Sequence, residues 1–418
     1  MSAPSIDQAI LERLPIIDRH GDTFAYELRY AHKGDGRNDD APPCDLEAAS
    51  TVLAHVIGSL EGDSASGKPV FINVHLSLLT DEDFLALLPA GKVVLILHGT
   101  ADLVTDQVLA TCEALRRHNI GLCMDGWALG STCPELMIRS QYVKLDVLGH
   151  DGFDLYNHYT GLADYPAKKI ARQVSQSKEY RFCHGIGFDL FQGYFFTHPE
   201  AVSQKEVNTS VAQLVQLFEL VGNNAEAKDL EAVFKRDPAL VVKLLGYINS
   251  AGMGVGRKVT SIHQAIVLLG YKQLYRWVAL LLYTSGSNAA PAALMKTVLA
   301  RSRFIELLGR PLLPKHEQDN LFMVGMLSML DVVFGQPLDQ ALARLPLPDS
   351  IIRAILDRDG ILGRLLSLAE AVEQGDLEEI DALVAELRLS ATQPDASPAQ
   401  ILNRLQMEAV NWAESLAL

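Results

Sequence analysis

Five polar residues lie at or near the ends of apolar, strand-like runs in the first half of the sequence. They are Glu27, Asn73, Asp125, Lys144 and Gln192. In an α/β barrel the C-terminal ends of the strands carry the chemistry, and carboxylate and amide oxygens are ligands that divalent cations prefer. These positions therefore trace the frame of a metal-dependent barrel site. Only two of the five residues, Glu27 and Asp125, are carboxylates, so the site has few acidic ligands for a divalent cation.

The elements that must position these residues alternate along residues 1 to about 200. Short β-rich runs are separated by amphipathic segments, and the runs are RLPIID, FAYELRY, KPVFINVHL, KVVLIL, IGLCMD, YVKLDV, KKIARQV and FDLFQGYFF. Strands that alternate with helices indicate parallel pairing. About eight such units in 200 residues predict a compact, TIM-like (β/α)8 barrel.

The second half of the sequence is helical. From about residue 204 the β-rich runs end, and segments such as PALVVKLLGYINS and KQLYRWVALLLY carry apolar residues at helical spacing. The predicted fold class is therefore α/β followed by all-α. We assign residues 1–200 to the barrel and residues 201–418 to an all-helical domain, joined by the polar segment 197–208.

The succession of motifs in the first half resembles a known family. PIID and YEL are followed by FIN, VVLIL, MDGW, VKLD and FDLFQGYFF over roughly residues 11–200. This order is similar to that of the EAL family of cyclic-di-GMP phosphodiesterases, in a variant where AYEL replaces the name motif. The resemblance implies a barrel in which several carboxylates and one Asn hold divalent metals, and these metals activate a water for attack on a phosphodiester.

Part of the EAL site is kept in this sequence. By the resemblance, Glu27 matches the Glu of the name motif and Asn73 matches the metal-binding Asn, while Lys144 and Gln192 are also retained. The paired aspartates of the family correspond to Asp125 and its neighbour, so one of the two is present. The surviving residues outline the family's site without completing it.

Three metal-ligand positions have changed in type. Ile96 stands where the resemblance implies an acidic ligand, Gly126 where it implies the second aspartate, and Arg172 where it implies a glutamate. An isoleucine and a glycine offer no side-chain oxygen, and an arginine puts positive charge where a metal would sit. We therefore expect no metal, no cofactor and no catalytic residue in this barrel, and no enzymatic activity.

The retained side chains also have an architectural interpretation. Glu27 can accept a hydrogen bond from Asn73 or pair with Lys144 inside the barrel mouth, and Asp125 can pair with Lys144 or Arg172. The family's phosphate-binding Arg corresponds to Ala31 in this sequence. Loss of a phosphate contact weakens binding, so we do not expect cyclic-di-GMP to bind in the leading interpretation.

Motifs in the second half resemble the HDOD domain, a helical relative of the HD phosphohydrolases. DPAL, INSA, SIHQAIVLLG and RWV occur together and in order within roughly residues 205–400. Ser328 and Met329 stand where the His-Asp metal pair of HD enzymes would fall, so the resemblance implies no metal site there. His263 lies in the apolar SIHQAIVLLG segment, and we predict that it is packed in the core.

Composition restricts the partners. The formal charge of −15 argues against a nucleic-acid ligand, which needs clustered Lys and Arg. Apolar runs are shorter than the roughly 18 residues that suggest a membrane span, and the N-terminus lacks the features of a signal peptide. The five cysteines form no CxxC pair, and we expect Cys123 and Cys183 to be small buried side chains. These features predict a cytoplasmic protein.

Our leading hypothesis is a catalytically inactive bacterial signalling protein that acts through protein partners and is linked by family to cyclic-di-GMP signalling. A homodimer through the EAL-like barrel is a secondary prediction. The alternative is a non-hydrolysing receptor for cyclic-di-GMP or another phosphate-bearing ligand, in which Arg172 supplies charge in place of a metal. An active phosphodiesterase would need acids from other positions, such as Asp146 and Asp151.

Overall fold

The computed structural model describes residues 10–30, 49–50, 52–53, 68–89, 91–126, 133–197, 209–249, 258–284, 292–389 and 396–416. Ala31 and nearly all of the predicted join lie outside these residues. The chain divides into two compact units: Met1–His198 with Glu370–Met407, and Pro199–Ala369 with Glu408–Leu418. This division differs from the expected one, because a C-terminal segment that we assigned to the helical domain belongs to the compact unit of the barrel.

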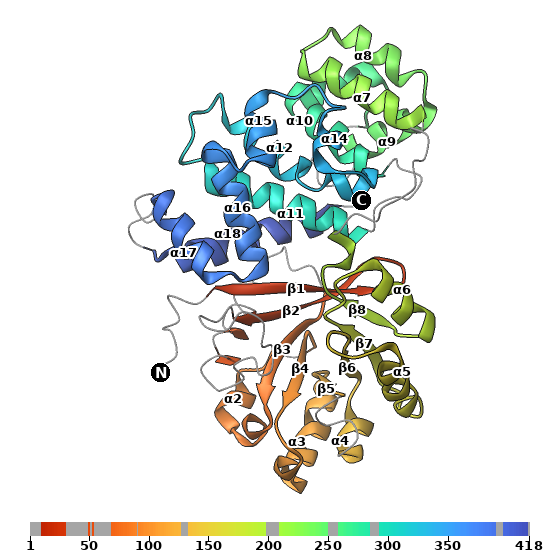
Figure 1. The fold of residues 1–418 in the computed structure, drawn as a ribbon, viewed down its shortest axis with the longest axis vertical. Helices are drawn as coiled ribbons and strands as arrows, with labels where there is room; N and C mark the ends of the chain where they lie inside the picture. The colour runs from red at the N-terminus through yellow and green to blue at the C-terminus, as the bar shows by residue number, and fades with distance from the viewer. Residues whose placement is uncertain are drawn as a thin grey trace. The chain divides into compact units, whose positions relative to one another are not determined.

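The first unit contains the predicted barrel (Figure 1). Its strands close in the order β1 to β8. They are β1 (Leu11–Asp18), β2 (Thr23–Tyr30), β3 (Val70–His75), β4 (Val93–His98), β5 (Gly121–Asp125), β6 (Tyr142–Asp146), β7 (Lys168–Arg172) and β8 (Leu190–Gln192). The (β/α)-type barrel expected from the sequence is therefore confirmed.

One strand departs from the expected parallel pairing. β1 is antiparallel to both of its neighbours, β2 and β8, whereas β2 to β8 pair in parallel. A parallel connection requires a crossover of a dozen or more residues, and only the short turn between Asp18 and Thr23 separates β1 from β2. The length of this turn is the physical reason for the difference.

The alternation of side chains along each strand determines which residues face the barrel interior. One buried layer consists of Ile16, Ala25, Phe71, Val94, Ile96, Cys123, Ile170 and Leu190. Two residues further along their strands, the same inward face carries Glu27, Asn73, His98, Asp125, Arg172 and Gln192. Apolar residues therefore fill the barrel, and polar residues gather at the C-terminal ends of its parallel strands.

Helices cover the outside of the strands (Figure 1). They are α2 (Glu82–Ala86), α3 (Asp106–Arg117), α4 (Pro134–Arg139), α5 (Gly152–Gly161) and α6 (Ser177–Ile186). Local signals fix their ends. Thr105 caps α3 by accepting a hydrogen bond from the Val108 N–H, and α6 stops at Gly187, whose φ is +114°.

The second unit is helical, as predicted. It contains α7 (Thr209–Gly222), α8 (Ala227–Phe234), α9 (Pro238–Ile248), α10 (Ile262–Thr284), α11 (Ala292–Gly309), α12 (Gln318–Leu327), α13 (Leu330–Phe334), α14 (Leu338–Leu342) and α15 (Asp349–Leu356). Two further helices, α16 (Gly360–Gln374) and α18 (Pro398–Ser415), contribute residues to both units, and α17 (Leu377–Glu386) belongs to the first.

One described helix is long and apolar enough to be compared with a membrane span. It covers Ile262–Tyr283. An 18-residue stretch within it has a mean hydropathy of 1.3, and 56% of that stretch is buried. Gly270 adopts φ 68° and ψ 164°, which breaks α10 into two shorter helices. Because a membrane helix needs about 20 continuous residues, this broken and half-buried helix is more typical of the core of a folded domain.

Candidate functional site

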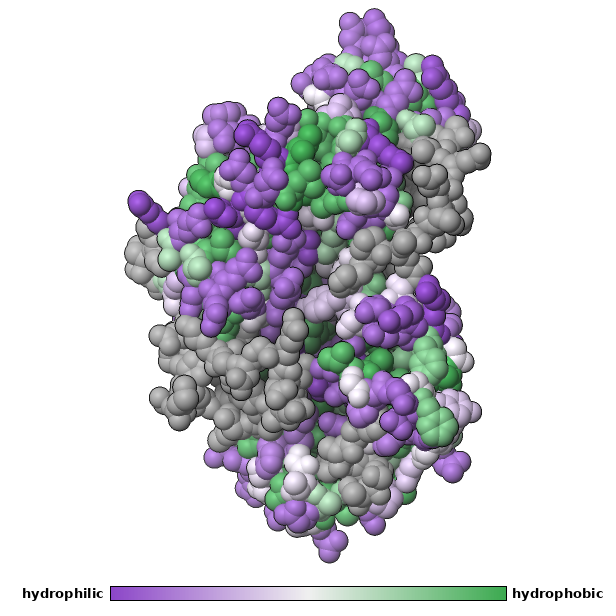
Figure 2. All heavy atoms as spheres, viewed as in Figure 1, coloured by the Kyte–Doolittle hydropathy of each residue, from purple (hydrophilic) through white to green (hydrophobic). Residues whose placement is uncertain are grey.

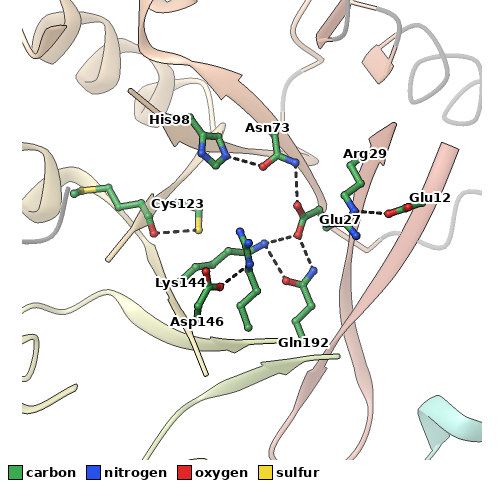
Figure 3. Close-up of polar contacts among 11 residues, drawn as sticks. Glu12, Glu27, Arg29, Asn73, His98, Cys123, Lys144, Asp146 and Gln192 are labelled. Atoms are coloured by element: carbon green, nitrogen blue, oxygen red, sulfur yellow. Dashed lines mark hydrogen bonds and ion pairs between the residues drawn. The ribbon is translucent and has the colours of Figure 1, made fainter. Parts of the chain in front are cut away.

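Glu27 lies at the centre of a buried hydrogen-bond network (Figure 3). Its Oε1 accepts a hydrogen bond from Asn73 Nδ2 at 2.9 Å, and its Oε2 accepts one from Gln192 Nε2 at 2.6 Å. Lys144 Nζ forms an ion pair with Oε2 and also donates to Gln192 Oε1 at 3.1 Å. All four side chains are at most 5% exposed. Both contacts that the sequence analysis considered for Glu27, with Asn73 and with Lys144, are present in the structure.

The charge of Glu27 depends on its neighbours. Burial by itself raises the pKa of the Glu27 carboxyl, but the charge of Lys144 and the hydrogen bonds from Lys144 and Asn73 outweigh burial. The resulting pKa lies well below its ordinary range. Glu27 is therefore an ionised carboxylate whose two oxygens are already engaged by the protein.

His98 joins the network, although we did not single it out from the sequence. Its Nε2 lies 2.7 Å from Asn73 Oδ1. The amide nitrogen of Asn73 donates to Glu27, so its oxygen is the acceptor here and His98 Nε2 carries the proton. Burial lowers the pKa of His98 to about 4, against the opposing charges of Asp125 and Glu27. The ring is therefore neutral near pH 7.

A simple pattern could have identified His98. It is the next inward-facing residue after Ile96 on β4, at the C-terminal end of that strand. The period-two alternation of a strand places position 98 on the same inward face as position 96. Position 96, where the resemblance implies an acidic ligand, is thus followed on the inward face by a neutral imidazole at position 98.

Ile96 is part of the barrel core. It is 1% exposed and pairs in register with Asn73 on one side and Cys123 on the other. The position that the resemblance assigns to an acidic ligand therefore faces the interior beside Asn73. An apolar side chain there completes the packed layer below the polar network.

Gly126 follows β5 in a crowded space. Its N–H donates to the Lys144 carbonyl at 2.7 Å. A Cβ at position 126 would lie 2.6 Å from Leu145 Cδ2 and 2.9 Å from Lys144 O. Real Cβ atoms almost never come as close to another atom as either of these distances. The space for the second aspartate of the family pair is therefore occupied by β6.

Arg172 does not stand alone in the barrel mouth. Its Nε lies 2.6 Å from Asp146 Oδ1, and the two side chains are 14% and 30% exposed. Asp125, at the end of β5, lies opposite Lys144 of the adjacent strand β6 in the strand register. The cation at the family's glutamate position is thus engaged by an acid from β6.

The donor set does not suit the metals that the resemblance implies. Within the described residues, no group of three or more His, Cys, Asp or Glu side chains is placed to hold a metal ion. Both oxygens of Glu27 and the oxygen of Asn73 already accept hydrogen bonds, and Lys144 supplies positive charge at the centre. A divalent cation would have to displace these contacts and the Lys144 ammonium to reach the Glu27 carboxylate.

The second unit has a polar contact where an HD enzyme would hold its His-Asp pair. Ser328 Oγ accepts a hydrogen bond from Arg301 Nη1 at 2.9 Å and donates to the Gly325 carbonyl at 2.9 Å. Ser328 is 8% exposed, Arg301 7% and Met329 6%. A buried guanidinium thus lies beside the position that we aligned with metal ligands.

Two other sequence predictions have different outcomes. The prediction that His263 is packed in the core is wrong, because its side chain is 63% exposed and lies 3.0 Å from Glu231 Oε1.

Cys123 and Cys183 are fully buried as predicted, and burial raises the pKa of each thiol to about 12. Neither thiol is an available nucleophile near pH 7.

Comparisons with known proteins agree with this architecture. The family model of the HDOD domain matches residues 206–340. The chain is 27% identical over 383 residues to a Vibrio cholerae protein named cyclic di-GMP phosphodiesterase CdgJ, covering 90% of this chain and 87% of that protein. It is 25% identical over 422 residues to the uncharacterized protein YuxH of Bacillus subtilis, covering 98% of this chain and 99% of that protein.

Among solved structures, the chain is similar to the EAL domain of FimX from Pseudomonas aeruginosa bound to c-di-GMP. The identity is 18% and the TM-score 0.35, with 46% of this chain and 90% of that domain covered. The assignment of the barrel does not depend on this likeness. It follows from the closed strand order, the antiparallel β1 and the inward polar residues described above.

Proposed function

We propose that this chain, in which an EAL-like barrel precedes an HDOD domain, is a catalytically inactive bacterial regulatory protein that acts through protein contacts in cyclic-di-GMP signalling. The observation that carries the proposal is the engagement of Glu27 by Lys144, Asn73 and Gln192. Every one of these contacts occupies an oxygen that a divalent cation would need. The changes at Ile96 and Gly126 remove further ligands.

The name of the Vibrio cholerae relative suggests the opposite activity, so hydrolysis is the decisive test. Purified protein is incubated with cyclic-di-GMP and Mg²⁺ or Mn²⁺, beside a Glu27→Gln variant that cannot bind a metal through this residue. We expect wild type and variant to show the same background rate. Metal-dependent hydrolysis by wild type that the variant lacks would overturn the proposal.

A non-hydrolysing receptor is the second candidate function. It is supported by the guanidinium of Arg172 at the C-terminal end of β7, where an anionic ligand could approach. The Asp146 partner opposes it, because a phosphate must displace that carboxylate. Calorimetric titration of cyclic-di-GMP into wild type and Arg172→Glu decides between the two candidates. Saturable binding by wild type that Arg172→Glu abolishes favours the receptor, and absence of heat favours the adaptor.

A homodimer through the barrel is a further part of the proposal. Apolar side chains are exposed on α5 and α6 and in the turn before α5, and Figure 2 shows apolar residues on the surface near α5. Leu148 is 61% exposed, Phe153 72%, Tyr156 49% and Phe182 39%. Sedimentation at micromolar concentration tests the dimer. A monomer that persists across this range would remove dimerisation from the proposal.

A further inference from the structure

Within the part of the chain that the structure describes, the first half of β1 has no strand partner on the β8 side. β8 pairs only with Ile16, Ile17 and Asp18, so the start of β1 extends beyond it. The N–H of Leu11 donates instead to Asn403 Oδ1 at 3.0 Å, and Asn403, from α18, is 3% exposed. A buried N–H without a partner is strongly unfavourable. A side chain from the C-terminal segment thus supplies the acceptor at the start of β1, beyond the residues that pair with β8.

A second bond ties the same segment to the end of β8. Gly193, with φ +146°, lets the chain turn closely over Val174 and places Tyr194 beyond the strand. The hydroxyl of Tyr194 donates to the carbonyl of Glu373 at 2.6 Å. Glu373 lies in the last turn of α16, where carbonyl groups have no partner within the helix. The end of α16 is therefore anchored at the C-terminal end of β8, which is on the mouth side of the barrel.

A third contact places the turn between α16 and α17 on a charged pair. Glu12 and Arg29 are opposite each other in the β1–β2 register and form an ion pair. They continue the inward face of Glu27 one step further toward the mouth. Gly375, with φ +69°, lies so close to Glu12 that a Cβ at this position would overlap Oε1. The turn at Gly375 therefore rests directly on the Glu12 side chain.

We propose that residues 370–389 and 396–407 form a built-in cap along the β8, β1 and β2 side of the barrel mouth, holding Arg29 on Glu12 and away from anions that enter the mouth. Arg29 lies two residues from Glu27, and its charge contributes to the low pKa of that carboxyl. A guanidinium in this place is well suited to a phosphate group once its carboxylate partner is removed. The cap goes beyond the proposed adaptor role, because it determines whether the mouth is available.

Hydrogen–deuterium exchange of the full-length protein tests whether the segment is held as one unit. Tyr194→Phe removes only the hydroxyl that binds Glu373. Leu11 takes no part in the Tyr194–Glu373 hydrogen bond. If the segment moves as one unit, loss of that bond should still raise the exchange rate of the Leu11 amide about fivefold, the factor expected for one hydrogen bond. Unchanged exchange at Leu11 would contradict a cap that moves as one unit.

A pair of glycine variants provides a matched comparison. Gly375→Ala collides with Glu12, whereas Gly360→Ala has a nearly identical φ of +68° and open space around it. Both changes introduce the same backbone strain, so only the collision differs. We expect exchange at Leu11 to be about tenfold faster in Gly375→Ala than in Gly360→Ala, as for about 1.4 kcal/mol of destabilisation. Equal exchange rates at Leu11 in the two glycine variants would overturn the proposal. If Gly375→Ala does not fold, the Tyr194→Phe measurement decides the question.

Titration with inorganic pyrophosphate tests the role of Arg29. Gly375→Ala should bind pyrophosphate at least about fivefold more tightly than Gly360→Ala, and adding Arg29→Gln should remove the gain. Equal affinity of the two glycine variants, or a gain that survives Arg29→Gln, would sink the assignment of Arg29. These readouts involve no hydrolysis, so the cap and the adaptor proposal can fail independently.

Discussion

Lys144 and Gln192 converge on a single oxygen atom, Glu27 Oε2, and Lys144 Nζ also lies 3.1 Å from Gln192 Oε1. The three groups form a closed triangle of an ammonium, an amide and a carboxylate inside the barrel. Each member makes a hydrogen bond or an ion pair with the other two. Its energetics can be tested separately from any ligand.

Removing the ammonium should destabilise the barrel strongly. In Lys144→Met, Glu27 is left as a buried carboxylate without its cation, and loss of one partner of a buried pair typically costs about 3–5 kcal/mol. Urea unfolding at pH 7 measures this change. The double variant Lys144→Met with Glu27→Gln should recover much of the loss, and a double variant no more stable than Lys144→Met would contradict the pair as the cause.

The same variant should change the pH dependence of stability. In wild type the pKa of Glu27 is depressed, so its contribution is present above the unfolded-state value of about 4.3 and is lost on acidification. Without Lys144, burial raises the pKa, and Glu27 then destabilises the fold as pH rises above about 4.3. Unfolding free energies from pH 4 to 8 should therefore show that the deficit of Lys144→Met grows with pH.

His98 should make the wild-type protein less stable in mild acid. Its pKa is about 4 in the folded protein and about 6.5 when unfolded, so the unfolded chain binds more protons between these values. Stability therefore rises with pH from about 4 to about 6.5. His98→Gln should flatten this part of the profile. An equally steep profile in His98→Gln would show that another group is responsible.

Restoring an aspartate at position 126 should not restore a metal site. Gly126→Asp places a Cβ against Leu145 and the Lys144 carbonyl, and such overpacking typically costs about 1–3 kcal/mol. Gly161→Asp is the control, since a Cβ there meets nothing within 4 Å. We expect a lower unfolding temperature for Gly126→Asp alone and no calorimetric Mn²⁺ binding. A stable variant that binds Mn²⁺ would refute this account of position 126.

Loss of the Ser328 hydroxyl should weaken the HDOD domain. Ser328→Ala leaves the buried Arg301 Nη1 without this acceptor, and a hydrogen bond to a charged group contributes about 1.5–3 kcal/mol. Thr297→Ala on the same helix as Arg301 removes only a bond to the Ala293 carbonyl and should cost less. Urea denaturation of the two variants gives the comparison. Equal stabilities would mean that the Arg301 contact contributes little.

The sequence was sufficient for the features that are local or periodic. Alternating strand and helix patterns predicted the barrel, and the strand ends marked Glu27, Asn73, Lys144 and Gln192, which the structure brings together. The antiparallel direction of β1 was also accessible, because the connection to β2 is too short for a crossover.

Other features depend on tertiary packing between distant residues. The bond from Leu11 to Asn403 joins residues 392 positions apart, and neither residue type signals the contact. The exposure of His263 depends on which face of α10 is covered, which an apolar run with little periodicity does not reveal. The crowding at Gly126 likewise arises from β6, a separate strand.

Position 126 also bears on how the protein can change over evolutionary time. Three groups crowd a side chain there. Two are methyl groups of Leu145 and Val143, which smaller residues would remove, but the third is the backbone carbonyl of Lys144. No side-chain replacement takes away a carbonyl. An acid at position 126 would therefore need β6 to shift as well, so a substitution at this position alone does not create the space for a carboxylate.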